Sequence, residues 1–244
     1  MIKKHSLRTA MLTLLVAMFA SQPVYALGTY AKGRAFIVVT KLESKGVFFT
    51  SYEGVFEVAS YDKSEKCDED NEQCYTPTKQ SVKFSISDDN KDVANFVLQN
   101  IGRLMIIDYK IHRITPIALS TDFEVVGAAA PLVQPKADFQ RSIRVVQTGK
   151  SKNFTFYGKI LRMEYRGTAN KSWECLVYNR EKDKVLPISI TDEEMAKYVQ
   201  SAMATAKEYY IGVSRAIFNT GALRDSNYDI YAINYDQAPG LISE

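Results

Sequence analysis

Two pairs of glutamates are the residues of this chain with the clearest capacity for chemistry. Glu43 and Glu53 lie ten positions apart, and Glu164 and Glu174 repeat that spacing. Two carboxylates on either side of a glycosidic bond can act as general acid and as base or nucleophile. Both pairs have basic neighbours, namely Lys41, Lys45, Arg162 and Arg166. Because cross-strand ion pairs explain the same residues more simply, hydrolysis by paired carboxylates is the weakest functional hypothesis.

Histidine chemistry has little support in the sequence. His112 lies between Lys110 and Arg113 at the end of a predicted strand, and no G-x-S-x-G elbow or other nucleophile motif accompanies it. A Ser-His-Asp or Cys-His arrangement needs such a partner. We therefore expect His112 to be an ordinary exposed loop residue. We also expect a protein that is not an enzyme, with no catalytic residue, no cofactor and no metal ion.

The first 26 residues have the features of a secretory signal peptide. Three basic residues precede an apolar run over residues 10–20, and the small-residue pattern V-Y-A ends at Ala26. This pattern predicts cleavage after Ala26. The apolar run is too short to span a bilayer permanently, although a retained N-terminal anchor is the alternative. We expect an exported protein, periplasmic or on the cell surface, with no transmembrane segment in the mature chain.

Two cysteines lie in an acidic, polar segment, residues 60–81. Cys67 and Cys74 are separated by six residues, and an exported chain meets oxidising conditions, so we predict a disulfide between them. A metal site made from the two thiolates and nearby carboxylates is the alternative, but it lacks a histidine and a second cysteine pair. The remaining Cys175 is predicted to be a buried thiol in a strand, with an intermolecular disulfide as the alternative.

The charge of the chain changes when the signal peptide is removed. The whole chain has 31 basic and 28 acidic residues. Residues 1–26 contain three of the basic residues and none of the acidic ones, so 28 of each remain. Nucleic-acid-binding domains usually carry a basic surface. Neutral charge and export therefore predict that nucleic acid is not a partner. We expect an envelope protein or a second copy of the chain as the partner, with a glycan as the alternative.

The segment around the first glutamate pair occurs twice. Residues 41–53 read K-L-E-S-K-G-V-F-F-T-S-Y-E, and residues 162–174 read R-M-E-Y-R-G-T-A-N-K-S-W-E. Four of the thirteen positions are identical, whereas a random window would share roughly one. Gly46 and Gly167 are one of the identical pairs, and we expect a positive φ at Gly46 in a hairpin turn. The sequence therefore predicts two copies of one domain.

Each copy is predicted to contain three strands, one helix and two strands. In the first copy these are residues 35–42, 47–59 and 82–87, a helix capped by Ser87, and residues 103–110 and 121–126. In the second copy Thr191 is the predicted helix cap, with Glu194 in the capping-box position. The order is that of the oligonucleotide/oligosaccharide-binding (OB) fold, so we predict a mainly β chain of tandem OB-like barrels. An SH3-like barrel or an α+β sandwich is the alternative.

The domain boundaries follow from composition. We predict a signal peptide at 1–26, a first repeat at 27–127 with the cysteine-containing insertion at 60–81, a linker at 128–140, a second repeat at 141–236 and a tail at 237–244.

The chain carries a resemblance in its first copy. Residues Lys41–Gly54 end in T-S-Y-E-G, and Phe84–Asp88 read F-S-I-S-D. The chain thus resembles small uncharacterised bacterial envelope proteins with the pattern K-x-S-x-K-G-x-x-F-K-T-W-E-G followed by F-S-V-x-D. The resemblance covers about residues 34–127, departs at Thr50 and Ser51, and implies fold and compartment without any catalytic residue. The chain also resembles spirochaete periplasmic proteins, which include accessory subunits of flagellar sheaths.

Aromatic residues supply the candidate contacts. Tyr52 and Trp173 are equivalent in the two copies, and with Glu53 and Glu174 they are predicted partner or glycan contacts, although core packing explains the aromatic residues equally well. A second candidate contact face consists of Tyr209, Tyr210, Tyr228, Tyr231 and Tyr235. The leading functional hypothesis is a non-catalytic envelope interaction or structural module, such as an accessory subunit of a flagellar sheath. A glycan- or peptidoglycan-binding module is the first alternative.

Overall fold

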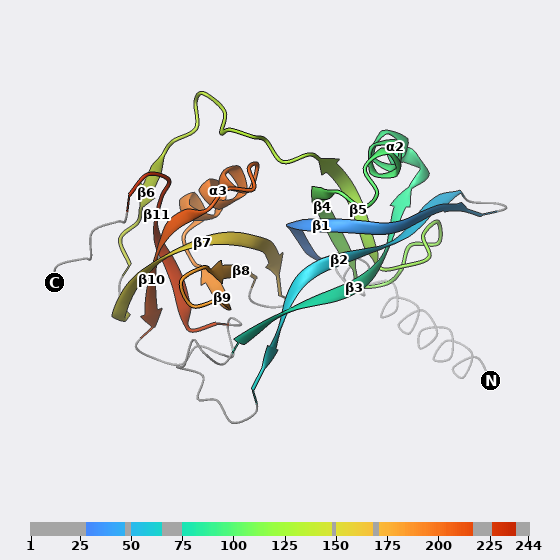
Figure 1. The fold of residues 1–244 in the computed structure, drawn as a ribbon. Coiled ribbons are helices and arrows are strands. Elements are labelled where there is room, and N and C mark those ends of the chain that lie inside the picture. Colours follow the sequence, from blue (N-terminus) through green and yellow to red (C-terminus); the bar gives the residue numbers. More distant parts are fainter. Residues whose placement is uncertain are drawn as a thin grey trace, which may run out of the picture.

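β-Strands make up most of the described chain in the computed structural model, which describes residues 28–46, 50–64, 75–147, 150–167, 171–216 and 226–237. The predicted signal cleavage site and the Cys67–Cys74 disulfide lie outside these residues. The strands of the first half are β1 (Thr29–Lys45), β2 (Ser51–Lys63), β3 (Tyr75–Ser87), β4 (Leu104–His112) and β5 (Phe123–Ala129). Those of the second half are β6 (Ser142–Arg144), β7 (Lys150–Arg166), β8 (Ser172–Asn179), β9 (Lys184–Ile190), β10 (Tyr209–Ala216) and β11 (Tyr228–Asn234). Helices α2 (Lys91–Gln99) and α3 (Glu193–Ala202) each follow the third long strand of a half (Figure 1).

The strands of the first half pair in a circuit. β1 pairs with β2, β2 with β3, β5 with β4 and β4 with β1, all antiparallel. The single parallel contact joins β3 to β5 at Ser85 and Glu124. With its helix between the third and fourth strands, this arrangement is OB-fold-like, as predicted.

The second half has the same pairing order. β7, β8 and β9 are antiparallel neighbours, β10 pairs with both β11 and β7, and the parallel contact joins β9 to β11 at Ser189 and Asp229. The short β6, which the sequence did not predict, pairs with β11.

Local irregularities of the strands also coincide between the halves. The β1–β2 register shifts between Val39 and Lys41, and the β7–β8 register shifts between Ile160 and Arg162, which are the corresponding positions. The predicted positive φ at Gly46 is confirmed at 125°, and Gly167 has a φ of 130°. A side chain at either position would meet the steric cost of that backbone region, so glycine suits both turns.

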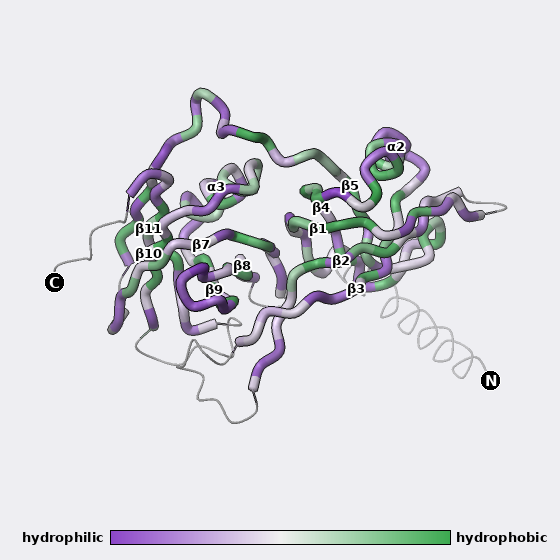
Figure 2. The backbone as a smooth tube through the Cα atoms, viewed as in Figure 1, coloured by the Kyte–Doolittle hydropathy of each residue, from purple (hydrophilic) through white to green (hydrophobic). Residues whose placement is uncertain are grey.

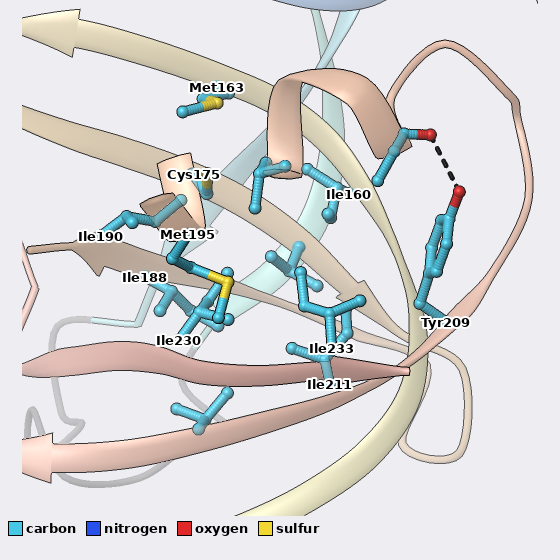
Figure 3. Close-up of a cluster of buried hydrophobic side chains, with 14 of the residues drawn as sticks. Ile160, Met163, Cys175, Ile188, Ile190, Met195, Tyr209, Ile211, Ile230 and Ile233 are labelled. Carbon is cyan, nitrogen blue, oxygen red and sulfur yellow. Dashed lines mark hydrogen bonds between the residues drawn. The ribbon is translucent and has the colours of Figure 1, made fainter. Parts of the chain in front are cut away.

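Each half has its own apolar core. In the first half, alternate residues of the strands pack against α2 through Ala94 and Val97. In the second half, Met195 and Val199 of α3 pack onto isoleucines of the surrounding strands (Figure 3). Figure 2 shows hydrophobic stretches, in green, along many of the strands. Burial of these apolar side chains is the main stabilising contribution to each half.

The two halves are joined by one strand ladder. Residues 31–35 of β1 pair with residues 162–166 of β7. A Cβ atom at Gly33 would lie 2.6 Å from the Met163 carbonyl oxygen and from the Tyr109 ring, so only glycine permits this approach. The Tyr109 hydroxyl donates a 2.7 Å hydrogen bond to Glu164 Oε2 across the junction. The halves therefore share a continuous sheet.

Arg34 adds a second connection. Its guanidinium donates two hydrogen bonds to Asp108, at 2.7 and 2.9 Å, and a third to the carbonyl oxygen of Gln200 at 2.9 Å. Because Gln200 belongs to α3, this residue of β1 links the first half to the helix of the second.

The predicted polar insertion is partly strand. β2 continues to Lys63 and β3 begins at Tyr75, and the two strands stay paired over this whole length. The predicted strand bounds of 47–59 and 82–87 were wrong at this end, because Tyr75 is buried against the core of the second half and its ring centroid lies 5.3 Å from that of Tyr61. Contact with the other half stabilises strand structure that polar composition did not predict.

The helix starts differ in part from prediction. Ser87 Oγ accepts from Asp89 N, as expected of a cap, but a short 3-10 turn (Asp88–Asn90) precedes α2. Asp192, and not Thr191, caps α3, since its carboxylate accepts a 2.8 Å hydrogen bond from Met195 N. A carboxylate one residue later satisfies the same backbone donors.

Candidate functional site

Glu53 is a buried carboxylate held by hydroxyl groups. It is 7% exposed, and it pairs with Ser85 in the β2–β3 register. Ser51 Oγ donates to Glu53 Oε1 at 2.6 Å and Ser85 Oγ donates to Glu53 Oε2 at 2.7 Å. Ser120 N donates to the same carboxylate at 3.3 Å. These donors satisfy a buried acidic group that would otherwise be costly.

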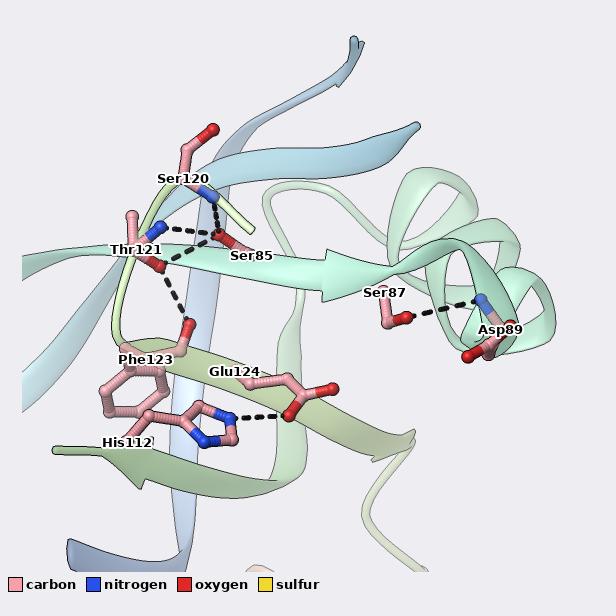
Figure 4. A network of polar contacts seen from close by, with 8 residues as sticks. All are labelled: Ser85, Ser87, Asp89, His112, Ser120, Thr121, Phe123 and Glu124. Atoms are coloured by element: carbon pink, nitrogen blue, oxygen red, sulfur yellow. Dashed lines mark hydrogen bonds and ion pairs between the residues drawn. The ribbon is translucent and has the colours of Figure 1, made fainter. Parts of the chain in front are cut away.

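Ser85 also organises the turn before β5. Its hydroxyl oxygen accepts from Ser120 N at 3.2 Å and from Thr121 N at 3.0 Å (Figure 4). Thr121 Oγ1 in turn donates to the carbonyl oxygen of Phe123 at 3.0 Å. Glu53 and Ser85 therefore fix the position of the segment that enters β5.

Glu174 repeats this arrangement in the second half. It is also 7% exposed, with Ser172 Oγ donating to Oε1 at 2.7 Å and Ser189 Oγ donating to Oε2 at 2.8 Å. Ser189 is paired with Glu174 in the register, as Ser85 is with Glu53. The serines were missed at the sequence level, although S-x-E and the later F-S-I-S and I-S-I-T segments occur in both copies. We assign Glu53 and Glu174 to structural contacts.

The other two glutamates make ion pairs along their own strands. Lys41 Nζ lies 2.8 Å from Glu43 Oε1, and Arg166 Nη1 lies 3.3 Å from Glu164 Oε1. The hydrogen bond from Lys41 lowers the pKa of Glu43. In these two ion pairs each partner is a second neighbour on the same strand, where side chains share a face.

His112 is not the exposed loop residue that the sequence predicted. It ends β4, and its Nε2 lies 2.8 Å from Glu124 Oε2 on β5 (Figure 4). Its side chain is 17% exposed. The imidazole of His112 therefore makes a cross-strand contact with Glu124, which joins β4 to β5.

Cys175 is buried, as predicted for its strand. Burial, and then the neighbouring Glu174, raise the pKa of its thiol far above the ordinary value. A thiol that stays protonated is a poor nucleophile. Among the described residues, no group of three histidine, cysteine, aspartate or glutamate side chains could hold a metal ion.

The predicted tyrosine contact face is largely core. Tyr209, Tyr228 and Tyr231 are at most 5% exposed, and the Tyr209 hydroxyl donates to the carbonyl oxygen of Ala202 at 2.9 Å. That prediction was wrong for these three residues, because nearly every residue of β10 and β11 is buried.

Trp173 and Tyr52 lie at corresponding places with different surroundings. Tyr52 is half-buried against the first core. Trp173 is also half-buried, but its ring centroid lies 4.8 Å from that of Tyr165 on β7. The corresponding residue of the first half is Ser44, so only the second half has an aromatic pair here.

The aromatic pair lines an open hollow of about 650 Å³, called the Trp173 hollow below. Its walls come from β7, β8 and α3 of the second half, and from Lys32 on β1 of the first. Lys32 Nζ and Lys171 Nζ lie 5.7 and 5.9 Å from the centre of the Tyr165 ring. Ammonium groups at this distance are attracted to the ring face. The hollow therefore combines two aromatic rings, tilted by 42° to one another, with positive charge.

A second open hollow, the Tyr198 hollow, lies beside the first. It has a volume of about 720 Å³ and is lined by α3, by Arg34 and by residues 135–140. The ring centroids of Phe139 and Tyr198 lie 5.4 Å apart here. Lys197 and Gln200 line both hollows.

Strand order and helix position define a mainly β, OB-fold-like protein. Residues 28–132 and 149–240 match the family model described as a domain of unknown function, DUF8785, and the chain belongs to this family. The comparison with curated proteins gives no match.

The solved structures similar to this chain include two of the single-stranded DNA-binding protein of Thermus aquaticus. The wild-type structure has 9% identity, a TM-score of 0.24, and coverage of 88% of this chain and 97% of that chain. A deletion mutant has 9% identity, a TM-score of 0.25, and coverage of 88% and 98%. At these TM-scores the likeness carries no argument about the function of this chain.

The predicted partners need a correction. The prediction that nucleic acid is not a partner is contradicted by the two similar structures above, which are of a single-stranded DNA-binding protein, and it is withdrawn. Within the described part of the chain, no helix is long and apolar enough to cross a membrane.

Proposed function

We propose that the chain is an exported, non-catalytic module made of two copies of one OB-like barrel. The shared strand circuit, the coincident register shifts and the two Ser-Glu-Ser clusters support the duplication. The proposed boundaries are those of the sequence, with a linker at 128–140. The basic and apolar pattern of residues 1–26 supports export.

The module binds a glycan at the Trp173 hollow. The carrying observation is the half-buried Trp173–Tyr165 pair in the wall of an open hollow. Aromatic rings offer a flat apolar face to a sugar ring, while nearby polar groups hydrogen-bond its hydroxyls. The reactive side chains weighed for catalysis, Glu53, Glu174 and His112, are instead engaged in structural contacts.

A second candidate function is a structural subunit of an envelope assembly, such as a flagellar sheath. One observation favours it: Leu98, Ile101 and Leu104, at the end of α2 and the start of β4, are 44%, 40% and 44% exposed. Neighbouring exposed apolar side chains mark protein contact sites when they form a patch.

The test uses the single tryptophan of the chain. The full chain, expressed with its own residues 1–26, is titrated with peptidoglycan fragments and with oligosaccharides, and the fluorescence of Trp173 is followed. We expect a saturable change in fluorescence. In calorimetry, Trp173→Ala should lower the affinity for the glycan at least about tenfold, a typical effect for a central aromatic contact. Tyr52→Ala is the matched control and should bind normally. Equal losses in both variants, or no glycan bound, would contradict the proposal.

A further inference from the structure

We propose that the glycan is anionic and that it extends from the Trp173 hollow across α3 into the Tyr198 hollow. This inference rests on the proposed function and specifies its ligand. Three observations carry it: the charges in the Trp173 hollow, their position over the aromatic pair, and the residues that the two hollows share.

The charges in the Trp173 hollow are mostly positive. Lys32, Lys171 and Lys197 line it, and Glu193 is its acidic residue. Glu193 Oε1 lies 2.9 Å from Lys197 Nζ, one turn along α3. Lys32 and Lys171 have no ion-pair partner among the described residues. Two ammonium groups therefore remain for an anionic ligand.

The position of these lysines matches a sugar that carries a carboxylate. Both ammonium groups lie within 6 Å of the Tyr165 ring, which contacts Trp173. A ring stacked on the aromatic pair would place a substituent at its edge near Lys32 or Lys171. The ion pair would form at the rim of an apolar surface, where it is less screened than in open water.

The two hollows form neighbouring subsites. Lys197 and Gln200 border both, so a ligand that leaves Trp173 along this side of α3 reaches Phe139 and Tyr198. Lys136 and Arg34 supply positive charge in the Tyr198 hollow, and Asp138 and Glu194 supply negative charge. Arg34 is already paired with Asp108, which leaves Lys136 as the cation there for the ligand.

The spacing of charge favours a glycan with sparse carboxylates. Single-stranded nucleic acid carries a phosphate at each nucleotide, and its binding grooves follow the backbone with continuous positive charge. Here the cations are few: Lys32 and Lys171 in the Trp173 hollow, and Lys136 beside Asp138 and Glu194 in the Tyr198 hollow. A polymer whose carboxylates are separated by uncharged sugars matches these few cations better.

The test compares three probes by calorimetry with the full chain: a hyaluronan hexasaccharide, neutral chitohexaose and a ten-residue oligo-dT. We expect hyaluronan to bind most tightly, and to weaken as NaCl rises from 50 to 200 mM. The double variant Lys32→Gln/Lys171→Gln should lower hyaluronan affinity about fivefold, since each exposed ion pair contributes modestly. The matched control Lys79→Gln/Lys83→Gln changes two exposed lysines of β3 and should leave affinity unchanged.

The extension into the Tyr198 hollow has its own readout. We expect Lys136→Gln to weaken the hexasaccharide about twofold to threefold and to leave a hyaluronan disaccharide unaffected, because only the longer ligand reaches that subsite. Equal effects on both lengths would overturn the extension.

The remaining outcomes separate the two proposals. Chitohexaose binding as tightly as hyaluronan, without salt dependence, would overturn the anionic inference and leave glycan binding intact. Preference for oligo-dT would overturn the inference in favour of nucleic acid. Binding of none of the probes, together with no response to peptidoglycan fragments, would remove the proposed function itself.

Discussion

The two halves share a buried Ser-Glu-Ser cluster but differ in the residues beside it. Both place a carboxylate between two serine hydroxyls, and both place an aromatic residue immediately before it, Tyr52 or Trp173. In the first half the neighbours of that aromatic residue are Ser44 and Thr50. In the second half they are Tyr165 and Lys171. The polar cluster thus recurs in both halves, while the aromatic pair with lysines beside it occurs only in the second.

The largest expected effect tests the shared part of this comparison. Glu53→Ala and Glu174→Ala each leave buried serine hydroxyls without their acceptor. We expect each change to lower the free energy of unfolding by about 2–3 kcal/mol, as for hydrogen bonds to charged groups. Urea denaturation measures this, with Glu57→Ala on the exposed side of β2 as the control. A large loss in one half and none in the other would show that the clusters are not equivalent.

A smaller effect is expected at the junction, which has no counterpart inside either half. Tyr109→Phe removes the 2.7 Å hydrogen bond to Glu164 and leaves that carboxylate with fewer donors. We expect a loss of about 1–2 kcal/mol in urea denaturation. Tyr61→Phe, on β2, is the control, and a Tyr109→Phe chain as stable as the wild type would show that the hydrogen bond is dispensable.

The helix starts provide a smaller contrast. Asp192→Ala removes the cap of α3 and should cost about 1 kcal/mol. Thr191→Ala, at the residue that the sequence predicted as cap, should be nearly neutral. Thermal unfolding of the two variants distinguishes them, and the opposite ranking would restore the sequence-based assignment.

The smallest effect concerns high pH. Burial, and then the nearby Glu164 carboxylate, raise the pKa of Tyr109 well above its usual value of about 10. The protonated Tyr109 phenol contributes its full stability below the pKa that it has in the unfolded chain. That contribution is lost as the pH rises through the higher pKa that the phenol has in the folded chain. We expect the free energy of unfolding to fall above about pH 10, and less steeply in Tyr109→Phe. Identical slopes from pH 8 to 11 would contradict this.

Much of the fold was predictable because local rules determine it. The recurrence of Gly46 as Gly167 and the apolar spacing in both helices predicted the element order of the structure apart from β6 and the 3-10 turn before α2. The length of β3 was not predictable, since Tyr75 gains its burial from the other half of the molecule. The pairing of the halves through Gly33 likewise depends on a contact between distant residues, which no local pattern reports.

The candidate site was predictable only in part. Trp173 was named from its equivalence with Tyr52, but its partners Tyr165 and Lys32 come from strands that meet only in the folded sheet. Glu53 and Glu174 were named for the same reason, and they serve the fold. Residues that the two halves share therefore contribute to the fold, while differences between the halves mark the candidate site.

The most direct test of the Trp173 hollow is the indole N–H signal in a ¹H–¹⁵N spectrum of the full chain, because the chain has one tryptophan. Addition of a glycan oligosaccharide should shift this signal saturably, and Tyr52→Ala should leave that response intact. A glycan that binds while the indole signal stays in place would contradict the account.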